Sequence, residues 1–256
     1  MSVIGGRVFV ALTLIAALSD GVLAQDNTAA PRHLLSLDVS RMQPFRRAYE
    51  MIVRGRDSSI VIGQREVVLT AAVYSGEPSW LLVETRTGLV PAVESLYVAP
   101  DLRPLHWSSA LGTARLGTEF VGDSIYGAMT SPTGKQNIVA AGRPDLLVSG
   151  AMLEALLPLL PLSSTWVDSV GVLSVDLATT HVIPAELAVV REEDLVTDTL
   201  AIRPTWVVAL RAGQLSLQYW VDKTSGAVLR VTQPLSPHAG TELEYRLHAD
   251  SIGVSP

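Results

Sequence analysis

Alternation of apolar and polar residues along much of the chain limits its fold more than any other feature. In residues 241–248 (TELEYRLH) every second side chain from Leu243 is apolar, and the side chains between them are polar or charged. Residues 214–222 carry the same pattern, which Trp220 alone interrupts, and Trp206, Val208 and Leu210 form a third apolar stripe. A period of two places successive side chains on opposite faces of an extended backbone, so the pattern predicts half-buried β-strands.

Turn-forming residues separate these segments. Gly122-Asp123 suits a two-residue hairpin with glycine at its first central position, and residues 223–226 (KTSG) suit another tight bend. Strands joined so closely are antiparallel, because parallel neighbours need a long crossover. Roughly ten strands in sequential order therefore predict a mainly β protein with a single antiparallel sheet that curls or nearly closes. The expected strands are 49–53, 59–74, 80–85, 93–98, 115–121, 124–130, 166–176, 206–210, 214–222 and 241–248.

One segment breaks the pattern and predicts a helix. In residues 149–160 (SGAMLEALLPLL) the leucines have helical spacing, Ser149 suits the N-cap, and Pro158 limits the helix. Glu154 is the only charged residue of the segment, so the helix is apolar on most sides. We expect it on the concave side of the sheet, either as a plug that fills the core or as a lid over an apolar groove.

The tryptophans bear on the same two alternatives. Trp166, Trp206 and Trp220 lie in expected strands, where they pack in the core or line a groove. Trp107 lies in residues 100–109 (PDLRPLHWSS), outside any clear strand, and is expected to anchor that loop against the sheet. The residues expected to contact an apolar ligand in the groove are Met152, Leu153, Leu156, Leu157, Leu160, Trp206 and Trp220.

The first 24 residues have the features of a secretory signal peptide. Arg7 provides the positive start, residues 8–18 (VFVALTLIAAL) are an apolar run, and cleavage is expected after Ala24. The run is shorter than the ~20 residues that span a bilayer, which disfavours an uncleaved anchor and predicts no stable membrane span after cleavage. Residues 25–44 are expected to be a partly disordered leader, and 45–256 a single β domain. The predicted location is periplasmic or secreted.

Composition excludes several classes of function. The net charge is −6, and nucleic acid is not an expected partner because a phosphate backbone selects a basic surface. The chain has no cysteine, which excludes disulfides, iron–sulfur clusters and thiol nucleophiles. Lysine occurs only at Lys135 and Lys223 and asparagine only at Asn27 and Asn137, a bias typical of GC-rich bacterial genomes.

Motifs of common catalytic sites are absent from the sequence. It has no G-x-S-x-G elbow, phosphate-binding loop or H-E-x-x-H pair. The run Glu192-Glu193-Asp194 is expected in a solvated, charged loop. We therefore predict no catalytic residue, metal or cofactor, with an unrecognised hydrolase assembled from loop residues as an alternative. The histidines are scattered without metal-ligand spacing and are His33, His106, His181, His238 and His248.

A motif in the second half of the chain resembles a known family. Residues 220–230 (WVDKTSGAVLR) are similar to the W-x-D-x-x-[ST]-G-x-[LV]-[LV]-R hairpin of DUF3108-like exported bacterial proteins. The helix followed by Leu160-Pro161-Leu162 and the strand at 206–210 take matching places, so the resemblance covers residues 145–248. It implies a LolA/LolB-like fold, which is an unclosed antiparallel barrel with helices on its concave face. Lipoprotein carriers of that fold shelter acyl chains, but no individual cargo-binding residue carries over.

The function expected from these features is that of an exported envelope protein that binds a lipid-like or apolar ligand in the groove of a half-barrel, without catalysis. One alternative is a periplasmic scaffold with a filled core that binds another envelope protein, and another is the unrecognised hydrolase. The turn from Asp222 to Gly226 is expected to be structural. Asp222 should bond to the turn backbone, and Gly226 should have a positive φ.

Overall fold

The computed structural model describes residues 37–89, 91–141, 146–175, 180–197, 199–213, 215–236 and 240–248. The expected signal peptide and residues 25–36 of the expected leader lie outside this part of the chain, as do His33 and His238. A 3-10 turn, η1 (Val39–Arg41), precedes a single sheet of fifteen strands. The sheet order places eight strands in a first half and seven in a second.

The bounds of the elements follow chain order. The first half of the sheet consists of β1 (Phe45–Arg54), β2 (Ser59–Tyr74), β3 (Glu77–Gly88), β4 (Ala92–Val98), β5 (Pro104–Leu111), β6 (Ala114–Val121), β7 (Ser124–Ser131) and β8 (Gly134–Ala141). The second half consists of β9 (Leu146–Leu147), β10 (Val167–Val175), β11 (Thr180–Val196), β12 (Ile202–Ala212), β13 (Leu215–Asp222), β14 (Val228–Ser236) and β15 (Thr241–Leu247). Between β9 and β10 lie α1 (Gly150–Leu156) and the 3-10 turn η2 (Leu157–Leu159).

The strand order is sequential except at one junction. It runs from β8 back to β1, which pairs with β15, and then from β15 back to β9. The short β9 is parallel to β10, and the other neighbours are antiparallel. β8 lies close to β11 without a strand ladder between their described residues, so the sheet curls round and stays unclosed. The mainly β class and the single curved sheet are confirmed.

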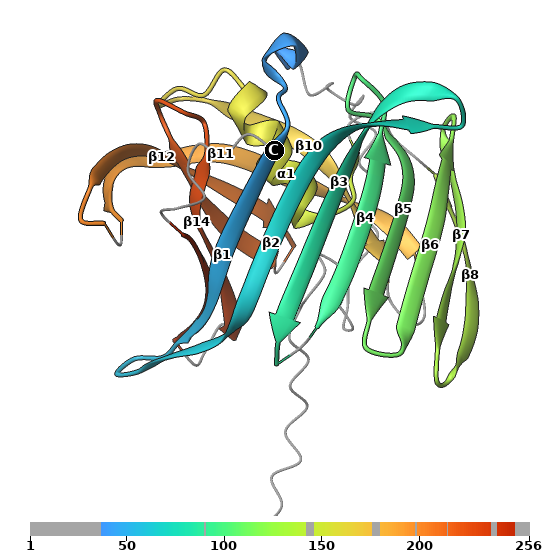
Figure 1. The fold of residues 1–256 in the computed structure, drawn as a ribbon, viewed down its shortest axis with the longest axis horizontal. Coiled ribbons are helices and arrows are strands. Elements are labelled where there is room, and N and C mark those ends of the chain that lie inside the picture. Colours follow the sequence, from blue (N-terminus) through green and yellow to red (C-terminus); the bar gives the residue numbers. More distant parts are fainter. Residues whose placement is uncertain are drawn as a thin grey trace, which may run out of the picture.

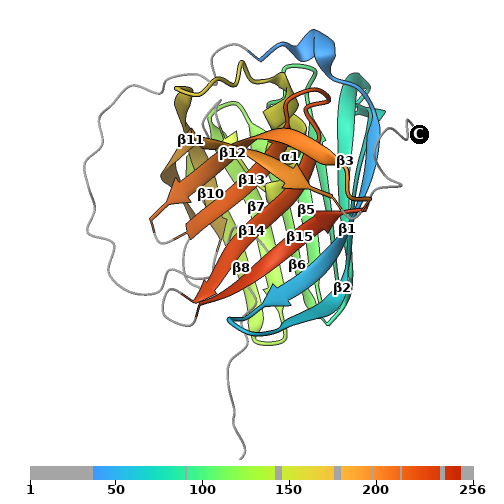
Figure 2. The same ribbon diagram turned by 90° about the vertical axis from the view of Figure 1, so that its left-hand side faces the viewer.

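The helix α1 lies between the two halves of this sheet. In Figure 1, β1 to β8 stand side by side, and β10 and β11 cross behind them at a steep angle. Figure 2, turned by 90°, shows β10 to β15 on the near side, β5 to β8 behind them, and α1 between the two layers. The short helix therefore occupies the concave side, as predicted.

Packing against the sheet stabilises α1. Ser149 Oγ accepts a hydrogen bond from Met152 N at 3.2 Å and caps the first turn, while Pro158 falls in η2 and limits α1 to seven residues. A helix this short is not stable alone in water. The apolar residues of α1 belong to one core cluster that also contains the strand residues Val208, Leu217 and Tyr219.

In the described residues, no helix is both long and apolar enough to cross a membrane.

The turn between β13 and β14 supports the segment that follows α1. Asp222 Oδ1 accepts hydrogen bonds from the backbone N–H groups of Thr224 at 2.7 Å and Ser225 at 2.9 Å. Gly226 has a φ of 72°, and a Cβ there would lie 2.9 Å from Cβ of Pro158. Both the backbone conformation and this close approach therefore require glycine, and both expectations for the turn are confirmed.

Two segments that the sequence predicts as loops are strands. Trp107 lies in β5 and is fully buried, and Pro104 takes the first position of this strand, where a residue without an N–H is tolerated. Glu192-Glu193-Asp194 lie in β11. A register shift between Val189 and Arg191 interrupts the alternation of β11, which is why the charged run does not look like a strand. Both segments were wrongly predicted as loops, whereas the expected solvation of the charged run is confirmed for Glu192 and Asp194, which are exposed.

Candidate functional site

Five of the seven candidate groove residues lie on α1 or directly after it. They are buried, with exposed fractions of 0% to 5%. In one apolar cluster they join side chains from both halves of the sheet, so the helix fills the concave side in this structure. These residues are Met152, Leu153, Leu156, Leu157 and Leu160.

The two tryptophan candidates lie on different faces of the sheet. Trp206 pairs with Val221, which shares a face of β13 with the core residue Tyr219. Trp220 comes between these two residues of β13 and therefore points to the outer face. There its ring centre lies 5.5 Å from the guanidinium carbon of Arg191 and 3.7 Å from that of Arg230. The structure brings Trp206, but not Trp220, to the face that carries α1.

A row of buried charges, absent from the sequence prediction, runs from α1 into the first half of the sheet. Arg65 of β2 donates from Nη1 to Glu154 of α1 at 2.5 Å and from Nη2 to Glu84 of β3 at 2.8 Å. Arg86 of β3 lies 3.1 Å from Glu84 and donates to Glu94 of β4 at 2.9 Å. The side chains in these pairs are 1% to 7% exposed. We call these five residues the inner charge ladder.

Aromatic side chains surround the end of the ladder at α1. The hydroxyl of Tyr49 donates to Glu154 Oε2 at 2.8 Å. The guanidinium carbon of Arg65 lies 5.2 Å and 4.9 Å from the ring centres of Tyr49 and Tyr245. Burial and the charge of Glu154 raise the pKa of Tyr49 well above its usual value. Burial opposes the charge of Arg65, but the carboxylates of Glu154 and Glu84 outweigh it and raise its pKa, so Arg65 is a permanent cation.

The other end of the ladder holds a proton. Burial and the neighbouring carboxylate of Glu84 raise the pKa of Glu94 to about 8. Burial also opposes the ionisation of Glu84, but Arg65 and Arg86 outweigh it and lower the pKa of Glu84. At neutral pH Glu94 is therefore mostly protonated, and the carboxylates of Glu84 and Glu154 balance the two guanidinium groups.

Strand alternation contains a signal of this ladder. Arg65 precedes the core residue Val67 by two positions, and Glu84 follows the core residue Leu82 by two, so both charges share the inward face. Glu94 is in phase with the core residues of β4 in the same way. A charged residue in phase with a buried stripe is the observation that could have indicated an ionic site inside the barrel.

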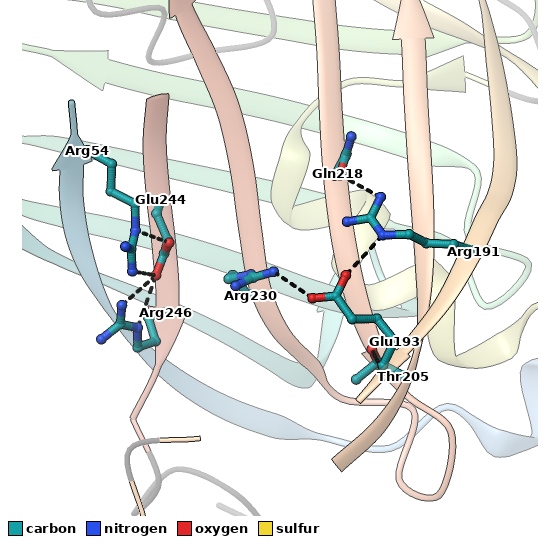
Figure 3. A network of polar contacts seen from close by, with 8 residues as sticks. All are labelled: Arg54, Arg191, Glu193, Thr205, Gln218, Arg230, Glu244 and Arg246. Carbon is teal, nitrogen blue, oxygen red and sulfur yellow. Dashed lines mark hydrogen bonds and ion pairs between the residues drawn. The ribbon is translucent and has the colours of Figure 1, made fainter. Parts of the chain in front are cut away.

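The outer face carries a second set of ion pairs, which Figure 3 shows from close by. Two glutamates each accept hydrogen bonds from two arginines over distances of 2.5 Å to 3.4 Å. The arginine side chains are 23% to 44% exposed. Arg54 and Arg246 donate to Glu244, and Arg191 and Arg230 donate to Glu193. We call these six residues the outer charge network.

A third polar group lies on the outer face of the first half. Glu119 accepts a hydrogen bond from the hydroxyl of Tyr74 at 2.7 Å, and its other oxygen lies 2.8 Å from Nδ1 of His106. The rings of Tyr74 and His106 stack with their centres 5.9 Å apart. Within the described part of the chain, no serine or threonine hydroxyl is hydrogen-bonded to His106, and no group of three His, Asp or Glu residues could hold a metal ion.

Comparisons with known proteins bear on the fold. Neither a protein-family model nor a curated protein matches the chain. Among solved structures, the chain is similar to a β-barrel-like protein of a domain of unknown function, DUF1849, from Brucella abortus. The two have 10% sequence identity and a TM-score of 0.55 over 81% of this chain and 97% of the other. At that identity the likeness shows a β-barrel-like fold and leaves the finer DUF3108-like or LolA-like assignment unshown.

Proposed function

We propose that this chain is an exported, non-catalytic envelope protein that binds a lipid-like or apolar ligand between α1 and the concave side of its sheet. The position of α1 carries the proposal, because a short apolar helix occupies the hollow of an unclosed sheet. The resemblance of residues 145–248 to DUF3108-like proteins, and through them to the LolA-like fold, supports the same function.

The contacts that hold α1 are ones that an acyl chain can replace. Most of them are apolar contacts of leucine side chains, and burial of apolar surface is favourable without regard to direction. Leu153, Leu156 and Leu157 face a core made of strand side chains rather than a specific polar pocket. Moreover, β8 and β11 lie close together without a strand ladder between their described residues, so their separation breaks no such ladder.

The packing of the same helix favours a second candidate function. The five candidate residues around α1 are at most 5% exposed, as in a permanently assembled core. In that case the protein is a scaffold, and its partner is another envelope protein that binds the outer surface.

Titration with a fluorescent acyl-chain probe distinguishes the two candidates. We expect saturable binding of one probe per chain, and at least about tenfold weaker binding by Leu156→Glu, which places a charge among the apolar contacts. Val139→Glu adds the same charge on β8 at a residue that is 69% exposed, and should leave binding unchanged. A folded native chain that binds no acyl-chain probe would exclude the ligand-binding function and leave the scaffold.

Export is tested separately by the intact mass of the protein expressed in a bacterial host. The expected mass is that of a chain beginning at Gln25, recovered from the periplasm or the medium. A mass that retains residues 1–24, with the protein in the membrane fraction, would contradict export with cleavage after Ala24.

A further inference from the structure

We infer, on the basis of the function proposed above, that the ligand is a long-chain carboxylate whose head group replaces the side chain of Glu154 on Arg65 and Tyr49. In this structure α1 itself has the chemistry of such a ligand. It is an apolar segment with a single carboxylate, and it lies inside the curved sheet.

The contacts of Glu154 define a carboxylate site. Glu154 is the only charged residue from Ser149 to Leu162, and it is 1% exposed. Its two oxygens have separate donors, because Arg65 Nη1 lies 2.5 Å from Oε1 and the hydroxyl of Tyr49 lies 2.8 Å from Oε2. A guanidinium group and a phenol that donate to the two oxygens of one carboxyl group bind any carboxylate placed there.

Stability alone does not account for this site. Removal of two charges from water is costly, and well-packed apolar residues are often at least as stabilising as a buried ion pair. An apolar residue in place of Glu154 would complete the apolar surface of α1 and leave Arg65 paired with Glu84. The buried carboxylate is therefore better explained as the occupant of an anion site than as a source of stability.

Charge balance explains why a carboxylate should replace Glu154 and an uncharged chain should not. When Glu154 leaves, the two guanidinium groups of the ladder face two carboxyl groups, and one of those holds a proton at neutral pH because burial and Glu84 raise the pKa of Glu94 to about 8. An incoming carboxylate restores the missing negative charge. The guanidinium groups are those of Arg65 and Arg86, and the carboxyl groups are those of Glu84 and Glu94.

The surroundings of the site fit the chain of such a ligand. Leu153 is adjacent to Glu154 in sequence and is 0% exposed, as is Leu157 three residues further on. Tyr245 borders the site from β15, with its ring centre 4.9 Å from the guanidinium carbon of Arg65. A carboxylate bound to Arg65 would therefore continue directly into the apolar core.

Displacement of a fluorescent acyl-chain probe by palmitate or by methyl palmitate at pH 7 tests the inference. For the native chain we expect palmitate to bind about tenfold more tightly than the ester, since only the acid pairs with Arg65. Glu154→Gln keeps the size of the side chain but removes its charge, and should raise the affinity for palmitate about tenfold further without changing that for the ester. Tyr49→Phe should lower the affinity for palmitate several-fold, because it removes one donor.

Glu66→Gln is the matched control. Glu66 is the neighbour of Arg65 on the opposite face of β2 and pairs with Arg46 there, so neither affinity should change. Equal binding of palmitate and its ester by the native chain and by Glu154→Gln would overturn the inference and leave the proposed function standing. Loss of palmitate binding by a folded Glu154→Gln chain would also overturn it, because Glu154 would then be a partner of the ligand and not its competitor. Failure of the native chain to bind any acyl-chain probe would instead overturn the proposed function.

Discussion

The inner charge ladder and the outer charge network use the same two residue types on opposite faces of one sheet. In the ladder both partners of each pair are 1% to 7% exposed, whereas in the network the arginines are 23% to 44% exposed and the glutamates are 34% (Glu193) and 2% (Glu244) exposed. Buried ions have lost their water and depend on each other, while exposed ions exchange partners with solvent at little cost. Identical arginine–glutamate contacts should therefore differ in their effect on stability, pH dependence and salt dependence.

The two sets also connect different parts of the molecule. The ladder joins α1 to β2, β3 and β4, so it couples the helix to the first half of the sheet. The network joins β1 to β15 and β11 to β14, which are already connected through the sheet. The inner pairs therefore hold α1 against the sheet, and the outer pairs add to connections between strands that the sheet already makes.

Removal of one arginine from each set should show the largest difference. Arg65→Met leaves the carboxylates of Glu154 and Glu84 without their shared cation in the core, and should lower the free energy of unfolding by about 3–5 kcal/mol. Arg54→Met removes a partner of Glu244 that is 38% exposed. The carboxylate of Glu244 is itself 2% exposed but keeps its hydrogen bond from Arg246, so the loss should be smaller, about 1 kcal/mol. Denaturant unfolding of both variants at pH 7 measures the difference, and equal losses would show that burial does not separate the two sets.

The pH dependence of stability that comes from Glu94 of the inner ladder should have the opposite sign to that from Glu244 of the outer network. The pKa of Glu94 is raised from 4.5 to about 8 in the folded chain, by burial and by Glu84. Between these values the unfolded chain loses the proton and the folded chain keeps it, so the free energy of unfolding should fall as pH rises, by at most about 1.4 kcal/mol per unit. Glu94→Gln should remove this slope. An unchanged slope in Glu94→Gln would contradict the assignment of the raised pKa to this residue.

Glu244 provides the comparison from the outer face. Burial opposes its ionisation, but hydrogen bonds from Arg54 and Arg246 outweigh burial and lower its pKa below 4.5. Its contribution to stability is therefore present above pH 4.5 and is lost as pH falls through the folded-state pKa. Glu244→Gln should reduce the slope on the acid side of the stability profile, to which the lowered pKa values of Glu84 and Glu193 also contribute, and leave the slope between pH 4.5 and about 8 intact. Loss of that upper slope instead would mean that the two sets titrate together.

Salt should produce the smallest of these effects. The Debye length falls from about 10 Å at 0.1 M salt to about 3 Å at 1 M, so exposed pairs are screened and buried pairs are not. The loss of stability in Arg54→Met should shrink by a few tenths of a kcal/mol over this range. The loss in Arg65→Met should stay constant within error. If its loss shrinks as much as that of Arg54→Met, the inner ladder is open to solvent.

Most strands of the first half, together with β10, β12, β13 and β15, were predictable from the sequence, whereas β5, β8, β11 and β14 lie in none of the expected strand ranges. The patterns around Leu243 and Tyr219 indicated β15 and β13, whereas Pro104 and the register shift after Val189 concealed β5 and β11. Leucine spacing likewise predicted α1 and its apolar contacts. Local patterns are sufficient where one face of an element is uniformly buried.

The inner ladder could not be predicted in the same way. Arg65 and Glu154 are 89 residues apart, and the curl of the whole sheet around α1 brings them together. Because that curl depends on long-range strand pairing, no window of sequence around either residue contains it. For Trp220 the local pattern was the better guide. Alternation in β13 assigns its side chain to the outer face, whereas its apolar character had suggested a place in the groove.

Native mass spectrometry of the chain purified from a bacterial envelope, followed by organic extraction, tests most directly whether the concave side binds an apolar ligand. We expect a co-purifying lipid mass of one molecule per chain, retained in Val139→Glu and lost from folded Leu156→Glu. A native chain that is purified without lipid, and that stays ligand-free after incubation with excess long-chain fatty acid, would contradict ligand binding on the concave side.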